Sequence, residues 1–196
     1  MTHRTIVIAG ASDGIGAAAA RRLSRSGENV VVGRSEGKTK AVAAELGADY
    51  FVVDFADLTQ VRAVADKIRS EYPRIDVLAN NAGGMCREVE ITADGYWARG
   101  LSAATFPPGY VNSNFGDASG SRMLLFMKNY VPITARFTST ADEGADQLVW
   151  LASTTPGVDW AAGEYYSKGR VGRANRAAYN AELARELWDR TSARLG

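Results

Sequence analysis

The fold is decided by Thr5-Ile6-Val7-Ile8-Ala9-Gly10-Ala11-Ser12-Asp13-Gly14-Ile15-Gly16, which runs into four alanines. The apolar, mostly β-branched residues from Ile6 predict a short buried strand, and the alanine run favours a helix. Between them, three glycines allow a tight turn and leave room for a phosphate at the helix start, where N–H groups and the helix dipole attract anions. The stretch therefore predicts a phosphate site in a strand, glycine turn and helix.

Further apolar strands alternate with helical segments along the rest of the chain. We predict strands at Thr5–Ala9, Asn29–Gly33, Tyr50–Val53, Ile75–Ala79 and Leu101–Phe106. Strands and helices that alternate with short loops form a parallel, right-handed sheet. The prediction is a single α/β domain over residues 1–196, with a Rossmann-like doubly wound parallel sheet between two helix layers.

Polar residues follow these strands at their carboxyl ends, where ligands of such sheets bind. Arg34 comes directly after the second predicted strand. An acidic residue at this place binds the ribose of NAD, whereas an arginine suits the 2′-phosphate of NADP. Lys38 follows one helical turn later, where a solvated helix charge is the simpler interpretation. The sequence predicts that NADP(H) is favoured over NAD(H).

The pattern Gly-x-x-x-Gly-x-Gly, Asp54 and Asn80-Asn81-Ala82-Gly83 together resemble the short-chain dehydrogenase/reductase family. Gly83-Gly84 with Thr92–Tyr96 looks most like its retinol-dehydrogenase-like branch. The resemblance implies that Asp54 meets the adenine ring of a dinucleotide cofactor and that residues further on touch its nicotinamide end. The cofactor-binding residues it implies are Gly10, Ser12, Asp13, Gly14, Ile15, Gly16, Arg34, Asp54, Asn81, Ala82, Gly83, Pro108, Gly109 and Val111.

The catalytic part of that family has no counterpart in this sequence. The family moves a proton with a tyrosine and a lysine four residues later, and holds its substrate with a serine on the preceding strand. None of the eight tyrosines is followed by lysine at that distance, and Tyr166 with Arg170 comes nearest. The resemblance thus implies that one strand and two helices are absent, with a junction near residues 96–100. We predict no catalytic residue, a sheet face without its helices, and the Leu101–Phe106 strand beside the fourth strand.

Composition narrows the function classes. A net charge of +1 over 196 residues argues against nucleic acid and membrane surfaces as partners. One cysteine, Cys86, and one histidine, His3, exclude a zinc site of such ligands, so no metal is predicted. The single cysteine suits a reducing compartment, the start before Ile6 is too short and polar for a signal peptide, and no apolar run reaches membrane-spanning length. We predict a cytoplasmic protein.

The C-terminal third keeps the order of the family. Met123–Met127 fits a mobile substrate lid or a short core helix equally well. Thr140-x-x-Glu143 predicts a capping box at the start of a helix, and Gly163–Tyr166 predicts the last strand. The final helix is predicted to bury Tyr179, Leu183, Leu187 and Trp188.

Two functions fit the sequence. One is an NADP(H)-dependent oxidoreductase of small carbonyls or alcohols whose catalysis is impaired in this chain. The other is a non-catalytic dinucleotide-binding protein, or a non-functional truncated remnant. An uncovered sheet face would in either case favour self-association.

Overall fold

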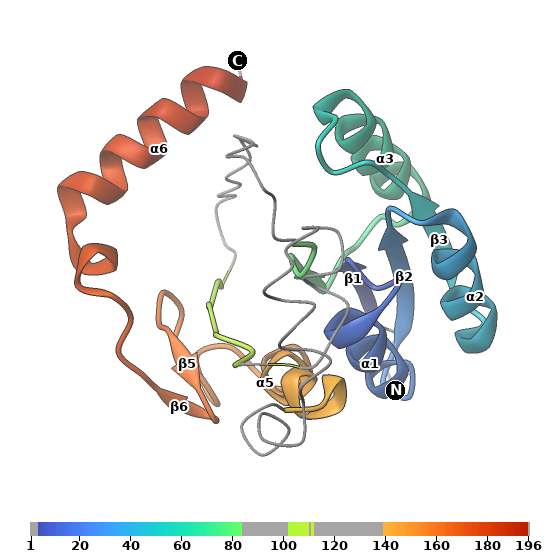
Figure 1. The fold of residues 1–196 in the computed structure, drawn as a ribbon, viewed down its shortest axis with the longest axis horizontal. Coiled ribbons are helices and arrows are strands. Elements are labelled where there is room, and N and C mark those ends of the chain that lie inside the picture. Colours follow the sequence, from blue (N-terminus) through green and yellow to red (C-terminus); the bar gives the residue numbers. More distant parts are fainter. Residues whose placement is uncertain (1–3, 84–101, 110, 112–138, 196) are drawn as a thin grey trace, which may run out of the picture. The chain divides into compact units, whose positions relative to one another are not determined.

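The computed structural model describes residues 4–83, 102–109, 111 and 139–195 (Figure 1). The chain divides into two compact units. The first comprises Met1–Arg87 and Pro108–Ser153, and the second Glu88–Pro107 and Thr154–Gly196. One domain over residues 1–196 stays a prediction.

A parallel four-stranded sheet is the centre of the first unit. Its strands are β1 (Thr5–Ala9), β2 (Glu28–Gly33), β3 (Asp49–Val52) and β4 (Val77–Ala79), in the order β3-β2-β1-β4. All three pairings are parallel. The first four strands predicted from the sequence are confirmed within two residues at each end, and so is the Rossmann-like α/β class.

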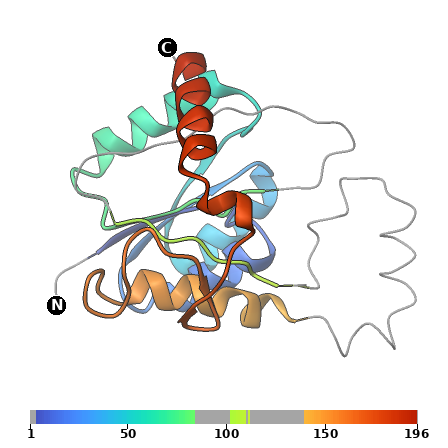
Figure 2. The same cartoon turned by 90° about the vertical axis from the view of Figure 1, so that its left-hand side faces the viewer.

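Four helices belong to the same unit: α1 (Gly14–Leu23), α2 (Glu36–Leu46), α3 (Leu58–Glu71) and α5 (Ala141–Ser153). Figure 2 shows α3 and α5 on opposite sides of the strands. Three of the four starts have a local cause: Asp13 caps α1, Asp57 caps α3, and Thr140 exchanges hydrogen bonds with Glu143 ahead of α5. The predicted capping box is therefore confirmed.

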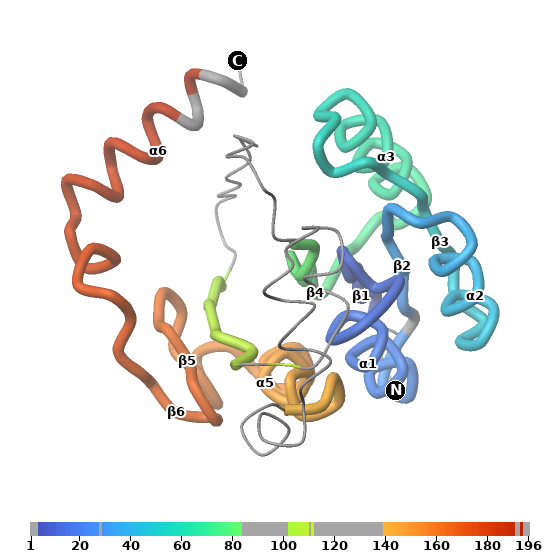
Figure 3. Tube along the Cα trace, viewed as in Figure 1, coloured from blue at the N-terminus to red at the C-terminus, as the bar shows by residue number. Residues whose placement is uncertain are grey.

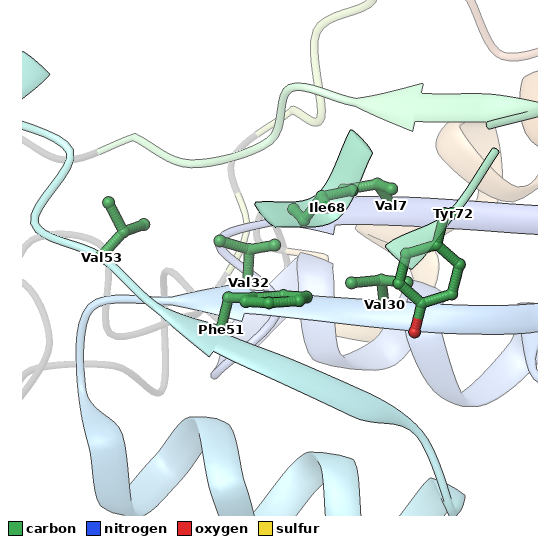
Figure 4. Packing of buried hydrophobic residues seen from close by; sticks show 7 residues of the cluster. All are labelled: Val7, Val30, Val32, Phe51, Val53, Ile68 and Tyr72. Atoms are coloured by element: carbon green, nitrogen blue, oxygen red, sulfur yellow. The ribbon is translucent and has the colours of Figure 1, made fainter. Parts of the chain in front are cut away.

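One face of the sheet carries a core that α3 closes (Figure 4). Its members from the strands are Val7, Val30, Val32 and Phe51, and Val53 directly follows β3. Ile68 comes from α3, and Tyr72 is the C-cap of that helix. The opposite face belongs to α1, where the buried Asn29 of β2 donates a hydrogen bond to the Ala20 carbonyl at 2.8 Å. These two layers fix the strand ends from which the site is built.

β4 forms one edge of the four-stranded sheet (Figure 3). Leu78 pairs in register with Val7 and so points to the face of the α3 core, since residues opposite each other in a parallel sheet share a face. Val7 is buried, whereas Leu78 is 57% exposed. The apolar surface of this face thus reaches solvent at its β4 end.

The predicted strand Leu101–Phe106 is wrong as a regular strand, and its described residues, 102–106, are not part of the four-stranded sheet. Thr105 forms an isolated parallel bridge with Tyr165 in the second unit. The N–H of Tyr166 donates to the Thr105 carbonyl at 2.8 Å, and the N–H of Gly163 to the Ala103 carbonyl at 2.8 Å. This backbone pairing covers residues 103–105. Pro107 and Pro108 come shortly after and have no N–H group to donate, so the pairing does not continue into a longer strand.

The rest of the second unit is β5 (Tyr166–Ser167) paired antiparallel with β6 (Arg170–Val171), the 3-10 turn η3 (Arg176–Tyr179) and α6 (Ala181–Leu195). The predicted last strand, Gly163–Tyr166, is wrong in its bounds and its place, because it overlaps β5 only at Tyr166 and β6 follows β5 along the chain. The buried face predicted for the final helix is wrong, because Tyr179, Leu183, Leu187 and Trp188 are all exposed. α6 packs on η3, a turn of four residues that itself holds Tyr179, and this contact leaves the four side chains exposed.

Several predictions fall outside the described residues: the junction near 96–100, the Met123–Met127 segment, Cys86 and His3. Within the part of the chain that is described, no helix is long and apolar enough to cross a membrane. The same residues hold no group of three potential metal ligands.

Candidate cofactor-binding site

The glycine turn after β1 is built so that side chains are excluded. Gly10 and Gly14 have φ of +71° and +54°, a region that favours glycine. A Cβ on Gly16 would lie 2.3 Å from the Gly10 carbonyl oxygen. Asp13 accepts a hydrogen bond from the Gly14 N–H through Oδ1 at 2.8 Å and so fixes the first residue of α1. The turn therefore brings bare backbone to the start of a helix, as a pyrophosphate requires.

Asn81 ties the end of β4 to this turn. Its Nδ2 donates to the Ala9 carbonyl at 3.2 Å and to the Gly10 carbonyl at 3.4 Å. A Cβ on Gly10 would come within 2.8 Å of the Ala82 Cα. The structure thus brings Asn81 and Ala82 against the glycine turn, and Gly83 follows them on the surface.

The end of β2 meets the same turn from the other side. A Cβ on Gly33 would lie 2.9 Å from the Ser12 Cβ and 2.5 Å from Thr39 Oγ1. Arg34 follows this contact directly and is exposed. Lys38, in the first turns of α2, donates from Nζ to Asp13 Oδ2 at 2.7 Å. Ser12, Asp13 and the start of α2 therefore surround the place where Arg34 leaves the strand.

Asp54 lies just past the end of β3 and is exposed. Its Oδ1 accepts from the Ala56 N–H at 3.1 Å, so the carboxylate holds the turn into α3. Asp57 then caps α3, and its pKa is lowered by hydrogen bonds from the Gln60 side chain and the Gln60 and Thr59 N–H groups. Asp54 thus lies at the strand edge that the sequence predicts, but no described contact joins it to the glycine turn.

A second approach to the turn comes from residues after 107. Val111 forms a parallel bridge with Ser139, just ahead of α5. A Cβ on Gly144 of α5 would lie 2.7 Å from Val111 Cγ2 and 3.1 Å from Ile15 Cγ1. Gly144 therefore brings Val111 and Ile15 to one place. Pro108 and Gly109 precede Val111 in the chain and are exposed, and Gly109 has φ of +78°.

Sequence reasoning did not single out Gly144 or Thr39. An isolated glycine inside an amphipathic helix often has a packing reason, and Gly144 carries that signal in the sequence. Thr39 is buried and donates to the Ser35 carbonyl at 2.6 Å, a contact within the start of α2 that no motif indicates.

The hydroxyl groups of two described tyrosines, Tyr72 and Tyr166, make hydrogen bonds within the fold. Tyr166 is buried, and its hydroxyl accepts from the Ala161 N–H at 2.8 Å. Tyr72 donates to the Asp49 carboxylate. Both hydroxyl groups thus hold parts of the fold together. The described residues of the glycine turn, by contrast, suit a dinucleotide, because Gly10, Gly14 and Gly16 form a cradle that any side chain would fill.

Comparison with known proteins bears on the same region. The model of the family described as short chain dehydrogenase matches residues 4–106, just over half of the chain, and includes the glycine turn, Arg34, Asp54 and Asn81. The chain belongs to the short chain dehydrogenase family. Members of this family bind NAD(P), and the Rossmann-like sheet found here agrees with that assignment.

Individual relatives extend the likeness beyond the matched region. "Putative daunorubicin C-13 ketoreductase DnrU" of Streptomyces sp. (strain C5) is 29% identical over 267 residues, covering 98% of this chain and 93% of that protein. Retinol dehydrogenase 14 of Mus musculus is 34% identical over 114 residues, covering 49% of this chain and 34% of that protein. This confirms the likeness to retinol dehydrogenases. The matches to retinol dehydrogenase 14 and to two other curated relatives span between 23% and 40% of the length of those proteins.

Solved structures give matches of the same extent. A 3-ketoacyl-(acyl-carrier-protein) reductase from Brucella melitensis complexed with NADH is 30% identical, with a TM-score of 0.40, over 42% of this chain and 36% of that one.

Proposed function

We propose that this chain is an NADP(H)-binding short-chain dehydrogenase that retains the cofactor half of the active site and has lost the residues that transfer the proton. The observation that carries the proposal is the contrast between the cofactor-binding residues, which are present, and the proton-transferring residues, which are absent from the sequence. A glycine turn, Arg34 and Asn81 meet at one sheet edge, whereas no tyrosine in the sequence has a lysine four positions later.

The choice of NADP(H) rests on Arg34. It leaves the carboxyl end of β2 beside Ser12 and Thr39, and no acidic residue replaces it. A guanidinium pairs well with a phosphate but offers no acceptor to ribose hydroxyls. Asp54, Ala82, Gly83, Pro108, Gly109 and Val111 are assigned to the rest of the cofactor by family resemblance.

The parent chemistry is the interconversion of a small carbonyl compound and an alcohol. The bound cofactor would supply or accept the hydride. The chain's own part is to hold the dinucleotide on its glycine turn and to move a proton at the substrate oxygen. No tyrosine and lysine pair is present for the proton transfer. Arg170 stands four positions after Tyr166, but an arginine is permanently charged and is therefore a poor proton relay. General acid–base catalysis typically contributes about 10²–10⁴-fold in rate.

An internal gap agrees with this loss. The alignment with the Streptomyces relative is longer than the chain, 267 against 196 residues, so part of that relative has no counterpart here. If the gap holds the missing strand and helices, the β4 edge loses its neighbours and Leu78 is left in solvent. Self-association through that edge is part of the proposal. A non-catalytic cofactor-binding protein and a truncated remnant both fit the same observations.

The cofactor preference is tested by titrating NADPH and NADH into the wild type and Arg34→Ala. Two charge-assisted hydrogen bonds to a phosphate stabilise binding by about 1.5–3 kcal/mol each, so we expect NADPH affinity to fall at least tenfold. NADH affinity should stay within about twofold of the wild type, because NADH lacks that phosphate. Arg25→Ala, an exposed arginine just after α1, is the matched control. Equal NADPH affinity of Arg34→Ala and wild type would contradict the proposal.

A further inference from the structure

A carboxylate stands inside the glycine turn, next to the place proposed for the cofactor's 2′-phosphate. Asp13 Oδ1 accepts from the Gly14 N–H at 2.8 Å, while its Oδ2 accepts from Lys38 Nζ at 2.7 Å. One side chain thus links the start of α1 to the start of α2. The side chains of Lys38 and Asp13 are 57% and 43% exposed, so a solute can reach both.

The surrounding contacts place this ion pair at the same corner as Arg34. Gly33 lies against Ser12 of the glycine turn and Thr39 of α2, and Arg34 is the next residue. Lys38 is one helical turn further on, beside Thr39. An anion that reaches Arg34 at this corner therefore meets two cations and one carboxylate.

Electrostatics favours the replacement of Asp13 by a phosphate as the partner of Lys38. An exposed ion pair between lysine and a carboxylate contributes little stability, because water and salt screen it. A phosphate monoester carries up to two negative charges and several strong acceptor oxygens, so it competes well for an ammonium. The carboxylate left behind would repel that phosphate.

We propose that Lys38 is a second cation for the 2′-phosphate of NADP(H), and that Asp13 competes with the phosphate for it. Binding exchanges the Lys38–Asp13 ion pair for a Lys38–phosphate pair. Asp13 thereby lowers the affinity for cofactors that carry a 2′-phosphate. Its other oxygen continues to cap α1. This inference rests on the proposed binding of NADP(H) and adds two residues that set its specificity.

The experiment uses adenosine 2′,5′-bisphosphate and 5′-AMP as probes, with binding followed by calorimetry on the full chain. Lys38→Ala should weaken bisphosphate binding about tenfold and leave 5′-AMP binding unchanged, because one charge-assisted contact to the 2′-phosphate is lost. Lys40→Ala, an exposed lysine of the same helix, should change neither.

Asp13→Asn keeps an oxygen for the Gly14 N–H but removes the charge, so the cap is retained. It should tighten bisphosphate binding several-fold, and this gain should shrink when Lys38→Ala is also present. Thermal unfolding of each variant checks that the fold persists. Unchanged bisphosphate affinity in Lys38→Ala, or weaker affinity in Asp13→Asn, overturns the inference.

The same titrations separate this inference from the function on which it rests. Loss of bisphosphate affinity in Arg34→Ala but not in Lys38→Ala overturns the exchange and supports Arg34 as the phosphate ligand. The reverse pattern supports Lys38 and contradicts the role of Arg34. A wild type that binds neither NADPH nor the bisphosphate overturns both.

Discussion

Gly16 occupies a position where a side chain has no room. A Cβ there would lie 2.3 Å from the Gly10 carbonyl oxygen and 2.6 Å from Asn81 Nδ2, and the oxygen belongs to backbone that cannot rotate away. Overpacking of this kind costs about 1–3 kcal/mol. We therefore expect Gly16→Ala to lower the thermal unfolding midpoint by roughly 5 °C.

Gly37 is the matched control for this substitution. It lies in the first turn of α2, and an added Cβ would meet nothing within 4 Å. Gly37→Ala should leave the midpoint unchanged or raise it slightly, because alanine favours helix by roughly 0.5–1 kcal/mol over glycine. Equal midpoints for Gly16→Ala and Gly37→Ala would show that the turn tolerates a side chain.

At the scale of single residues, the sequence predicts the positions of residues that belong to a local motif or to the end of a strand. The glycines, Arg34 and Asn81 lie where a motif and a strand end place them. The Lys38–Asp13 ion pair joins positions 25 residues apart and depends on how α2 packs against the glycine turn. The contact of Gly144 with Ile15 likewise depends on the docking of α5, which periodicity does not specify.

At the scale of elements, Asp76 fastens β4 to β1. It accepts a hydrogen bond from the Thr5 N–H at 3.0 Å, and Arg74 lies 2.6 Å away. The Thr5 N–H, and then the charge of Arg74, lower the pKa of this carboxyl below its ordinary value of 3.8. A lowered carboxyl pKa adds stability above the ordinary pKa, and this stability is lost as pH falls through the pKa of the folded state.

Asp76→Asn should therefore lower the free energy of unfolding by about 1 kcal/mol at pH 7, with a difference that shrinks below pH ~4. Urea unfolding of both proteins between pH 7 and 3.5 measures it. Asp66→Asn, at an exposed carboxylate of α3, should show no such trend. A difference that stays constant with pH would contradict the role given to the Asp76 charge.

Elements with a partner in the sheet were predictable, and those without one were not. β1 and β2 form where apolar runs predict them, because each is paired and covered. Residues 102–106 look equally strand-like in sequence, yet among the described residues their backbone pairs with residues 163–166 and not with the four-stranded sheet. The apolar positions of α6 follow helical spacing but stay exposed, since spacing shows which side chains share a face and not what covers it.

At the scale of the whole molecule, the exposed Leu78 bears on association. Its neighbour in register, Val7, is buried, so Leu78 extends an apolar face into solvent. Burying a leucine contributes about 1.5–3 kcal/mol, which corresponds to about tenfold or more in a dissociation constant. We expect concentration-dependent self-association that Leu78→Lys weakens by about that factor.

Sedimentation velocity over a range of protein concentrations measures this association. Val158→Lys is the control, because Val158 is 80% exposed and belongs to the other compact unit. A wild type that stays monomeric, or a Leu78→Lys variant that associates as strongly as the wild type, would contradict the prediction.

We expect this chain to bind NADPH and to lack the residues for proton transfer. The direct measurement is NADPH consumption by purified protein with a panel of aldehydes and ketones, under conditions where fluorescence shows the cofactor bound. We expect turnover below roughly 0.1 per second, at least 10²-fold under a typical enzyme. Turnover at ordinary rates that survives repeated purification, and that falls in Arg34→Ala, would contradict it. Tyr110 and Tyr166 would then be the first residues to replace.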